Sequence, residues 1–234
     1  MIKIVILDFD DTLIDNQYLD YQSFKQSSLK NRLNVITKND LKKMRQNSFN
    51  AKQIISKTYS HSEANLNNYL LLRKEFLQSI DSLPYLKLRP NSKNFLKFLN
   101  QNKIKIIICT LRKNKKIIKN FLKEKKLVNL FSSIIYLNEN DSQITSKKNP
   151  KKIKEYLVKQ IILKNNKKNY EYLLIGDSVE DEYSAIKNNI SYFIMRFEND
   201  IFNKPKLRNQ KESFIEIKKF IKSQNKIISV SKKS

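Results

Sequence analysis

Five short and almost wholly apolar runs divide the chain, and helical patterns separate them. The runs are rich in β-branched residues and lie at 2–7, 104–109, 133–137, 172–175 and 191–195. An apolar run without alternation is typical of a strand that is buried on both faces, as in a parallel sheet. Between the runs, apolar residues recur at helical spacing, for example within 91–99, 115–122 and 151–163. Alternating strands and helices form βαβ units, so we predict an α/β protein with a Rossmann-like parallel sheet.

One long stretch interrupts this alternation. Between Asp15 and Leu83 no convincing buried strand occurs, whereas helical patterns lie at about 18–33, 38–44, 51–59 and 63–80. We therefore expect residues 16–83 to form an inserted helical domain, and residues 1–15 and 84–222 to form the core. Residues 223–234 are polar and rich in lysine, and are expected to form a flexible basic tail.

The composition excludes several classes of protein. No apolar run approaches the roughly 20 residues of a membrane-spanning helix. The apolar start runs directly into Asp8 without the small-residue cleavage site of a secretory signal. A single cysteine excludes an internal disulfide framework, and a single histidine argues against a histidine-rich zinc site or a histidine-based triad. We therefore expect a cytoplasmic protein.

The formal net charge is strongly positive, at +25. A field of this sign attracts polyanions. The lysines are spread along the whole chain, however, and only seven residues are arginine, the side chain best suited to reading bases. The preference for Lys, Asn and Ile is also what an A/T-rich coding bias produces. We therefore expect no nucleic-acid partner beyond weak, non-specific binding.

Acidic residues follow the first apolar run directly. Asp8, Asp10 and Asp11 stand where that strand would end, and ligands of open parallel sheets bind beyond the carboxyl ends of the strands. Clustered carboxylates repel one another unless a cation shares them, and oxygen ligands suit Mg²⁺. A cluster of solvated helix N-cap residues is the alternative interpretation.

A second acidic cluster follows the apolar run at 172–175. It contains Gly176, which is the only glycine in the chain, followed by Asp177 and Asp181. A glycine retained in such a sequence indicates a positive φ or the close approach of another group. Asp177 and Asp181 are four residues apart, so one helical turn can direct both toward the same place. A tight turn with capping aspartates is the alternative, but it does not account for acids after two different strands.

Two further positions suggest phosphate binding. Thr110 ends the run at 104–109 and precedes Leu111, and a hydroxyl with free backbone N–H groups at such a junction can hold a phosphate oxygen. A simple helix cap explains Thr110 equally well. Lys147 and Lys148 precede Pro150 and a predicted helix, but among so many lysines their position alone says little.

Taken together, these residues resemble the four motifs of the haloacid dehalogenase superfamily. Asp8, Asp10 and Thr12 correspond to motif I, and Thr110 corresponds to motif II. Lys147 with Pro150 corresponds to motif III, with Lys148 in place of the first proline, so the choice between the two lysines is open. Gly176, Asp177 and Asp181 correspond to motif IV. The resemblance covers residues 1 to about 222, and the insertion is similar to the C1 helical cap of phosphoglycolate phosphatase-like members.

The resemblance implies an Mg²⁺-dependent phosphatase with an aspartyl-phosphate intermediate. Asp8 would be the nucleophile and Asp10 the general acid and base. The metal would be held by Asp8, the backbone carbonyl of Asp10 and Asp177, with Asp181 orienting water on the metal. Thr110, Leu111 and Lys147 would bind the phosphate oxygens.

Asp10 favours phosphate ester chemistry over dehalogenation, because a halide leaving group needs no proton. The expected substrate is a small phosphorylated metabolite, because a cap limits what can enter the site. One alternative is a sugar-phosphate mutase of the β-phosphoglucomutase type. Another is a basic, nucleic-acid-associated protein with the same fold.

Overall fold

The computed structural model describes residues 1–59, 63–136, 149–197, 200 and 207–231. Its core is a six-stranded sheet in the order β5-β4-β1-β6-β7-β8, and each neighbouring pair is parallel. The strands are β1 (Ile4–Leu7), β4 (Lys105–Thr110), β5 (Ser133–Tyr136), β6 (Tyr172–Gly176), β7 (Ser191–Met195) and β8 (Gln210–Lys211). The predicted α/β fold with a parallel sheet is confirmed, and all five apolar runs contain a strand.

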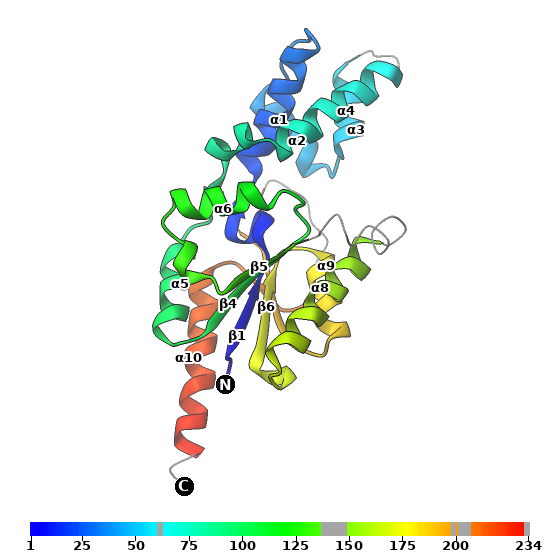
Figure 1. Ribbon diagram of the computed structural model, residues 1–234. Coiled ribbons are helices and arrows are strands. Elements are labelled where there is room, and N and C mark those ends of the chain that lie inside the picture. Colours follow the sequence, from blue (N-terminus) through cyan, green and yellow to red (C-terminus); the bar gives the residue numbers. More distant parts are fainter. Residues whose placement is uncertain (60–62, 137–148, 198–199, 201–206, 232–234) are drawn as a thin grey trace.

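Helices cover both faces of this sheet (Figure 1). Strand β1 is central, and all four of its residues are buried. Val5 and Leu7 pack in the cluster that contains α5 (Ser92–Gln101), α6 (Lys115–Glu124) and α10 (Phe214–Ser231). Ile4 and Ile6 pack on the other side, against α8 (Pro150–Asn165) and α9 (Val179–Lys187). Alternate side chains of one strand thus pack against two layers of helices, which is why β1 itself has no polar residues.

The insertion predicted between the first strand and the rest of the sheet is present as a helical cap. It consists of α1 (Gln17–Lys30), α2 (Lys38–Gln46), α3 (Ala51–Thr58) and α4 (Glu63–Gln78), which stand together at the top of Figure 1. The cap has its own core, with residues such as Phe24, Ile54 and Tyr69 fully buried. Because this cluster is separate from the two clusters of the sheet, the cap is packed as a unit of its own.

A short antiparallel pair of strands connects the cap to the core. Strands β2 (Ile14–Asp15) and β3 (Lys87–Leu88) pair with each other, and a 3₁₀ turn (Ile80–Tyr85) precedes β3. The buried Arg89 stabilises this connection through ion pairs. Its guanidinium lies 2.7 Å from the carboxylate of Asp200 and 3.6 Å from that of Asp11. The sequence did not predict this pair, since two-residue strands carry no periodic signal.

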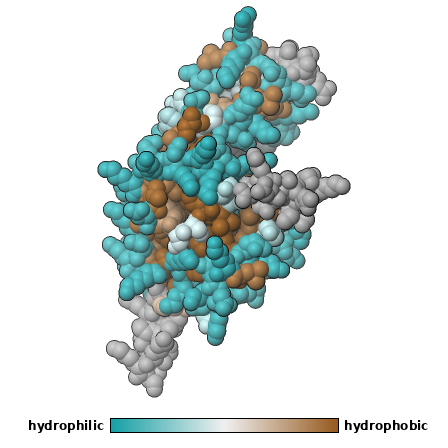
Figure 2. Space-filling view, viewed as in Figure 1, coloured by the Kyte–Doolittle hydropathy of each residue, from teal (hydrophilic) through white to brown (hydrophobic). Residues whose placement is uncertain are grey.

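Helix α10 extends to Ser231, so it takes in most of the segment that was expected to be a flexible tail. No glycine or proline follows Phe214 to end the helix, and the inner faces of Phe214, Ile217 and Ile221 are buried against the core. No described helix combines the length and the apolar character that a membrane-spanning segment needs. In Figure 2, polar side chains cover most of the visible surface of the cap and the rim of the core, whereas apolar side chains gather in the middle of the core face.

Candidate active site

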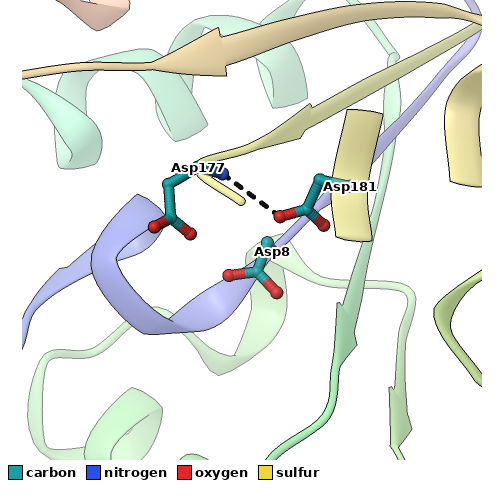
Figure 3. Close-up of side chains that lie close together, drawn as sticks. All are labelled: Asp8, Asp177 and Asp181. Atoms are coloured by element: carbon teal, nitrogen blue, oxygen red, sulfur yellow. Dashed lines mark hydrogen bonds between the residues drawn. The ribbon is translucent and has the colours of Figure 1, made fainter. Parts of the chain in front are cut away.

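The two acidic clusters meet at the carboxyl ends of β1 and β6. Leu7 lies opposite Ile175 in the parallel register, and the Asp8 amide donates a hydrogen bond to the Ile175 carbonyl at 2.8 Å. This register places Asp8 beside Asp177 and Asp181, and all three are buried. One carboxylate oxygen of each lies within 4.8 Å of the others (Figure 3). Two segments about 170 residues apart in the sequence thus form one cluster of carboxylates, which could hold a metal ion.

Gly176 makes this close approach possible. A Cβ atom built on Gly176 would lie 2.1 Å from Cγ of Asp181, far inside any tolerable contact. Asp181 is held there because its Oδ2 accepts hydrogen bonds from the backbone amides of Asp177 and Ser178, each at 3.2 Å. The Ser178 hydroxyl in turn caps α9 by accepting from the Asp181 amide. Of the two reasons considered for the glycine, the structure therefore supports close approach.

Replacing Gly176 with alanine should displace the Asp181 side chain and destabilise the protein. We expect the free energy of unfolding to fall by about 1–3 kcal/mol, because the added methyl cannot fit without shifting a hydrogen-bonded carboxylate. Urea titration followed by circular dichroism measures this loss. Ser191→Ala is the control, since Ser191 is exposed at the start of the neighbouring strand β7. Equal stability of the two variants would contradict the packing argument.

A buried lysine completes the carboxylate cluster. Lys154 projects from α8, and its Nζ donates to Asp8 Oδ1 at 2.5 Å and to the Cys109 carbonyl at 2.8 Å. The same Nζ lies 2.9 Å from Asp181 Oδ1. Sequence reasoning missed Lys154, although a signal existed: it shares the apolar face of the helix with Val158 and Ile161. Lys147 and Lys148 lie outside the described residues, so the prediction for Lys147 stays a prediction.

The charges in this cluster do not balance. Burial, together with the negative charges of Asp181 and Asp177, raises the pKa of Asp8 well above its usual range, although Lys154 opposes this. Burial alone would lower the pKa of Lys154, but Asp181 and Asp8 raise it, so the ammonium stays charged. Lys154 pairs with Asp8 and Asp181, and Arg196 acts on Asp177, so the three carboxylates still carry more negative charges than these two cations offset when all are ionised. A divalent cation with a preference for oxygen would neutralise them, and the set of donors therefore fits such an ion.

Asp10 lies in a different environment from Asp8. The Arg112 guanidinium donates hydrogen bonds to the Asp10 carboxylate from Nε at 3.1 Å and from Nη2 at 2.5 Å. The side-chain amide of Asn16 also donates to this carboxylate, at 2.9 Å. Burial would raise the pKa of Asp10, but the charge and hydrogen bonds of Arg112 outweigh it and lower the pKa. Arg112 also donates to the carbonyl of Leu77, at the end of α4. One arginine therefore contacts both the core site and the cap, a role that its place in the sequence did not reveal.

The remaining predicted residues lie around the same edge of the sheet. Thr110 ends β4 and is buried, and its hydroxyl accepts from the Arg112 amide at 3.1 Å. Leu111 follows it and is half-buried. The Thr12 hydroxyl donates to Asp177 Oδ1 at 3.2 Å and so orients that carboxylate. Burial raises the pKa of Cys109 to about 12, which keeps the thiol protonated, and its side chain packs among apolar residues of the sheet.

Comparison with known proteins supports the motifs found in the sequence. Residues 5–195 match the family model of haloacid dehalogenase-like hydrolases. The chain belongs to this family. No curated protein sequence matches it.

Several solved structures share the fold of this chain. A subfamily IA hydrolase from Geobacter sulfurreducens superposes with a TM-score of 0.69 at 15% identity, covering 92% of this chain and 94% of that one. A structure described as a predicted phosphatase from Clostridium acetobutylicum gives 0.65 at 19% identity, covering 95% and 100%. CbbY from Rhodobacter sphaeroides, solved with phosphate, gives 0.63 at 11% identity, covering 93% and 96%. At these identities the likeness concerns the fold, including the helical cap.

Proposed function

We propose that this haloacid dehalogenase-like hydrolase is an Mg²⁺-dependent phosphatase that acts on a small phosphate monoester. The observation that carries the proposal is the position of Asp8, buried at the end of β1 against Lys154 and beside Asp177 and Asp181. A carboxylate that is paired with an ammonium and lies at a possible cation site is suited to attack phosphorus. The positive charge around it offsets the repulsion between the anionic carboxylate and the anionic phosphate.

The reaction proceeds in two balanced steps. A carboxylate oxygen of Asp8 attacks phosphorus, the ester P–O bond breaks, and the leaving oxygen takes a proton from Asp10. Water then attacks phosphorus while Asp10 takes its proton, the P–O bond to the Asp8 oxygen breaks, and inorganic phosphate leaves with the Asp8 carboxylate regenerated. Arg112 favours ionised Asp10, which is the form that the second step requires. The first step requires protonated Asp10, and the proposal therefore requires the contact between Arg112 and Asp10 to loosen when substrate binds.

The metal would be held by the side chains of Asp8 and Asp177 and by the backbone carbonyl of Asp10. When bound, it would neutralise charge between the nucleophile and the phosphate. Asp181 Oδ2 accepts from backbone amides and Asp181 Oδ1 lies 2.9 Å from Lys154 Nζ, which suits the supporting role predicted for this residue. Lys154, Thr110 and the backbone amide of Leu111 bind phosphate oxygens in this proposal.

The size of the space between cap and core supports a small substrate. A cavity of about 540 Å³ lies between them and is lined by residues of both, including Asp10 and Arg112. Cavities of this size suit metabolites, whereas a polynucleotide would need an open channel. The general acid at Asp10 favours an ester over a halide as the substrate.

A phosphatase screen over a panel of phosphorylated metabolites, with and without Mg²⁺, tests the proposal. We expect some members of the panel to be hydrolysed, and only when the metal is present. RNA and DNA added to the same preparation should remain uncut. Metal-independent hydrolysis, or no hydrolysis of any ester by a protein shown to bind Mg²⁺, would overturn it.

Asp10→Asn should slow the enzyme in a manner that depends on the leaving group. An alkyl phosphate needs a proton at its leaving oxygen, so we expect its turnover to fall by about 10²–10⁴-fold. p-Nitrophenyl phosphate has an activated leaving group, and its first step should suffer much less. Burst kinetics with both esters measure that step, and Asp81→Asn is the control because Asp81 is exposed at the end of the cap. Equal losses for both esters would argue against Asp10 as the general acid.

A further inference from the structure

The cavity between cap and core has two walls of different chemistry. Asp10, Asp11 and Arg112 belong to the core wall, where the phosphate would react. The opposite wall belongs to the cap and carries a group of charged side chains, namely Asp20 of α1, Arg45 of α2 and Arg73 of α4. The transferred phosphate accounts for the core wall, but it leaves the charges on the cap wall without a function.

Arg45 and Arg73 share a single carboxylate. Arg45 donates hydrogen bonds to both carboxylate oxygens of Asp20, from Nε to Oδ2 at 2.9 Å and from Nη2 to Oδ1 at 2.9 Å. Its remaining nitrogen, Nη1, donates to the Phe49 carbonyl at 2.9 Å, so Arg45 is an anchor within the cap. Arg73 adds an ion pair from Nη2 to Asp20 Oδ1, which already accepts from Arg45. Two guanidinium groups therefore face one carboxylate, and one positive charge remains in excess.

Arg73 has a hydrogen-bond donor that its ion pair with Asp20 does not use. Its Nε is buried, and within the described residues it has no hydrogen-bond partner. Burial, with the neighbouring charge of Arg45, lowers the pKa of Arg73. Its guanidinium lies over the ring of Phe24, 4.7 Å from the centroid, and this contact helps to hold the group in place. A buried, oriented and incompletely neutralised guanidinium is the arrangement that binds an anion.

We propose that Arg73 forms the centre of a second anion subsite, and that the substrate is a phosphate ester with a carboxylate or second phosphate at its far end. This proposal rests on the phosphatase activity proposed above. The ester phosphate would lie at Asp8 and Lys154, while the distal anion would lie against the cap wall, where it neutralises the excess charge. A purely structural group would need only one arginine, since Arg45 alone occupies both oxygens of Asp20.

The test compares two series of esters that differ only at the far end. ω-Carboxyalkyl phosphates and alkanediol bisphosphates carry a distal anion, whereas ω-hydroxyalkyl phosphates do not, and each series is used with spacers of increasing length. At the best spacer, we expect kcat/KM to be about tenfold or more higher for an ester with the distal anion, as one added charge-assisted contact of roughly 1.4 kcal/mol gives. The gain should appear mainly in KM, because this contact is made equally in ground and transition states.

Arg73→Gln should reduce this ratio to near one, and Arg73→Lys should keep part of it because the charge remains without the fork. Arg32→Gln is the matched control, since Arg32 is an exposed arginine of the same cap. The ratio of kcat/KM values for two esters on one protein does not depend on the fraction that is folded. A partial loss of stability in a variant therefore cannot imitate the result.

The outcomes separate this proposal from the one on which it rests. If the hydroxyalkyl esters are hydrolysed but the wild-type ratio is near one, or if Arg73→Gln leaves the ratio unchanged, the second subsite is wrong and the phosphatase stands. If no ester is hydrolysed, the phosphatase is wrong, and calorimetric titration with the same esters decides the subsite. Tighter binding of the anionic series that Arg73→Gln abolishes would support it, and equal binding of both series would overturn it.

Discussion

Asp8→Asn is expected to lower the turnover by at least about 10³-fold while the protein remains folded. Asparagine has almost the same shape as aspartate, but it cannot attack phosphorus and is a poorer metal ligand. The fold should tolerate the change, because burial and two neighbouring acids raise the pKa of Asp8 and so make its charged form unfavourable in the metal-free protein. Removing that charge at neutral pH should leave the melting temperature unchanged or slightly higher.

Two measurements on the same samples check this expectation. Release of inorganic phosphate gives the turnover, and thermal unfolding with and without Mg²⁺ gives stability and metal response. Asp81→Asn, at an exposed aspartate, should match the wild type in both. The Mg²⁺-induced rise in melting temperature should shrink in Asp8→Asn alone. If Asp8→Asn kept near-normal turnover, the aspartyl-phosphate mechanism would have to be abandoned.

Strand β8 was not predicted, because its two residues carry no pattern. The rest of the sheet was predictable, because its inner strands β1, β4 and β6 are buried on both faces. Such burial requires continuous apolar runs, and the run at 191–195 marks β7 without error at either end. Helices of the cap were predictable for a similar reason, since their inner faces repeat at helical spacing. The hairpin of β2 and β3 was not predictable, because two residues are too few for any pattern. Helix α10 continues past its buried residues Phe214, Ile217 and Ile221 into a stretch that composition alone described as a tail.

The acids of the site were predictable from their place in the chain, whereas their cationic partners were not. Asp8 and Asp177 each follow a strand directly, so the strand order of a parallel sheet brings them together. Arg112 reaches Asp10 from the loop after β4, and Lys154 reaches Asp8 from α8, and only the packing of these segments reveals both contacts. The chain has 40 lysines and seven arginines, so the sequence alone does not show which of these basic residues lie at the site. A lysine on an apolar helical face is the exception that sequence reasoning can detect.

That exception leads to the second large effect, which concerns Lys154. Lys154→Met should lower turnover by about 10²–10³-fold, because it removes a buried positive charge worth roughly 2–4 kcal/mol to the transition state. It should also cost about 3–5 kcal/mol of stability without metal, because Asp8 and Asp181 lose their shared cation. Mg²⁺ should restore part of this stability by replacing some of the missing charge.

Comparison with other lysines decides whether Lys154 is the phosphate-binding lysine or only a partner of the acids. Lys164→Met, at an exposed position of the same helix, should have no effect. Lys147→Ala and Lys148→Ala test the assignment made from the motif spacing, and turnover is normalised to the folded fraction at saturating Mg²⁺. If Lys154 binds the phosphate, its variant should raise KM and lower kcat together while both alanine variants remain near wild type. A large loss at Lys147 with a near-normal Lys154→Met would return the role to Lys147. Lys154 would then serve only to keep three carboxylates together in the absence of the metal.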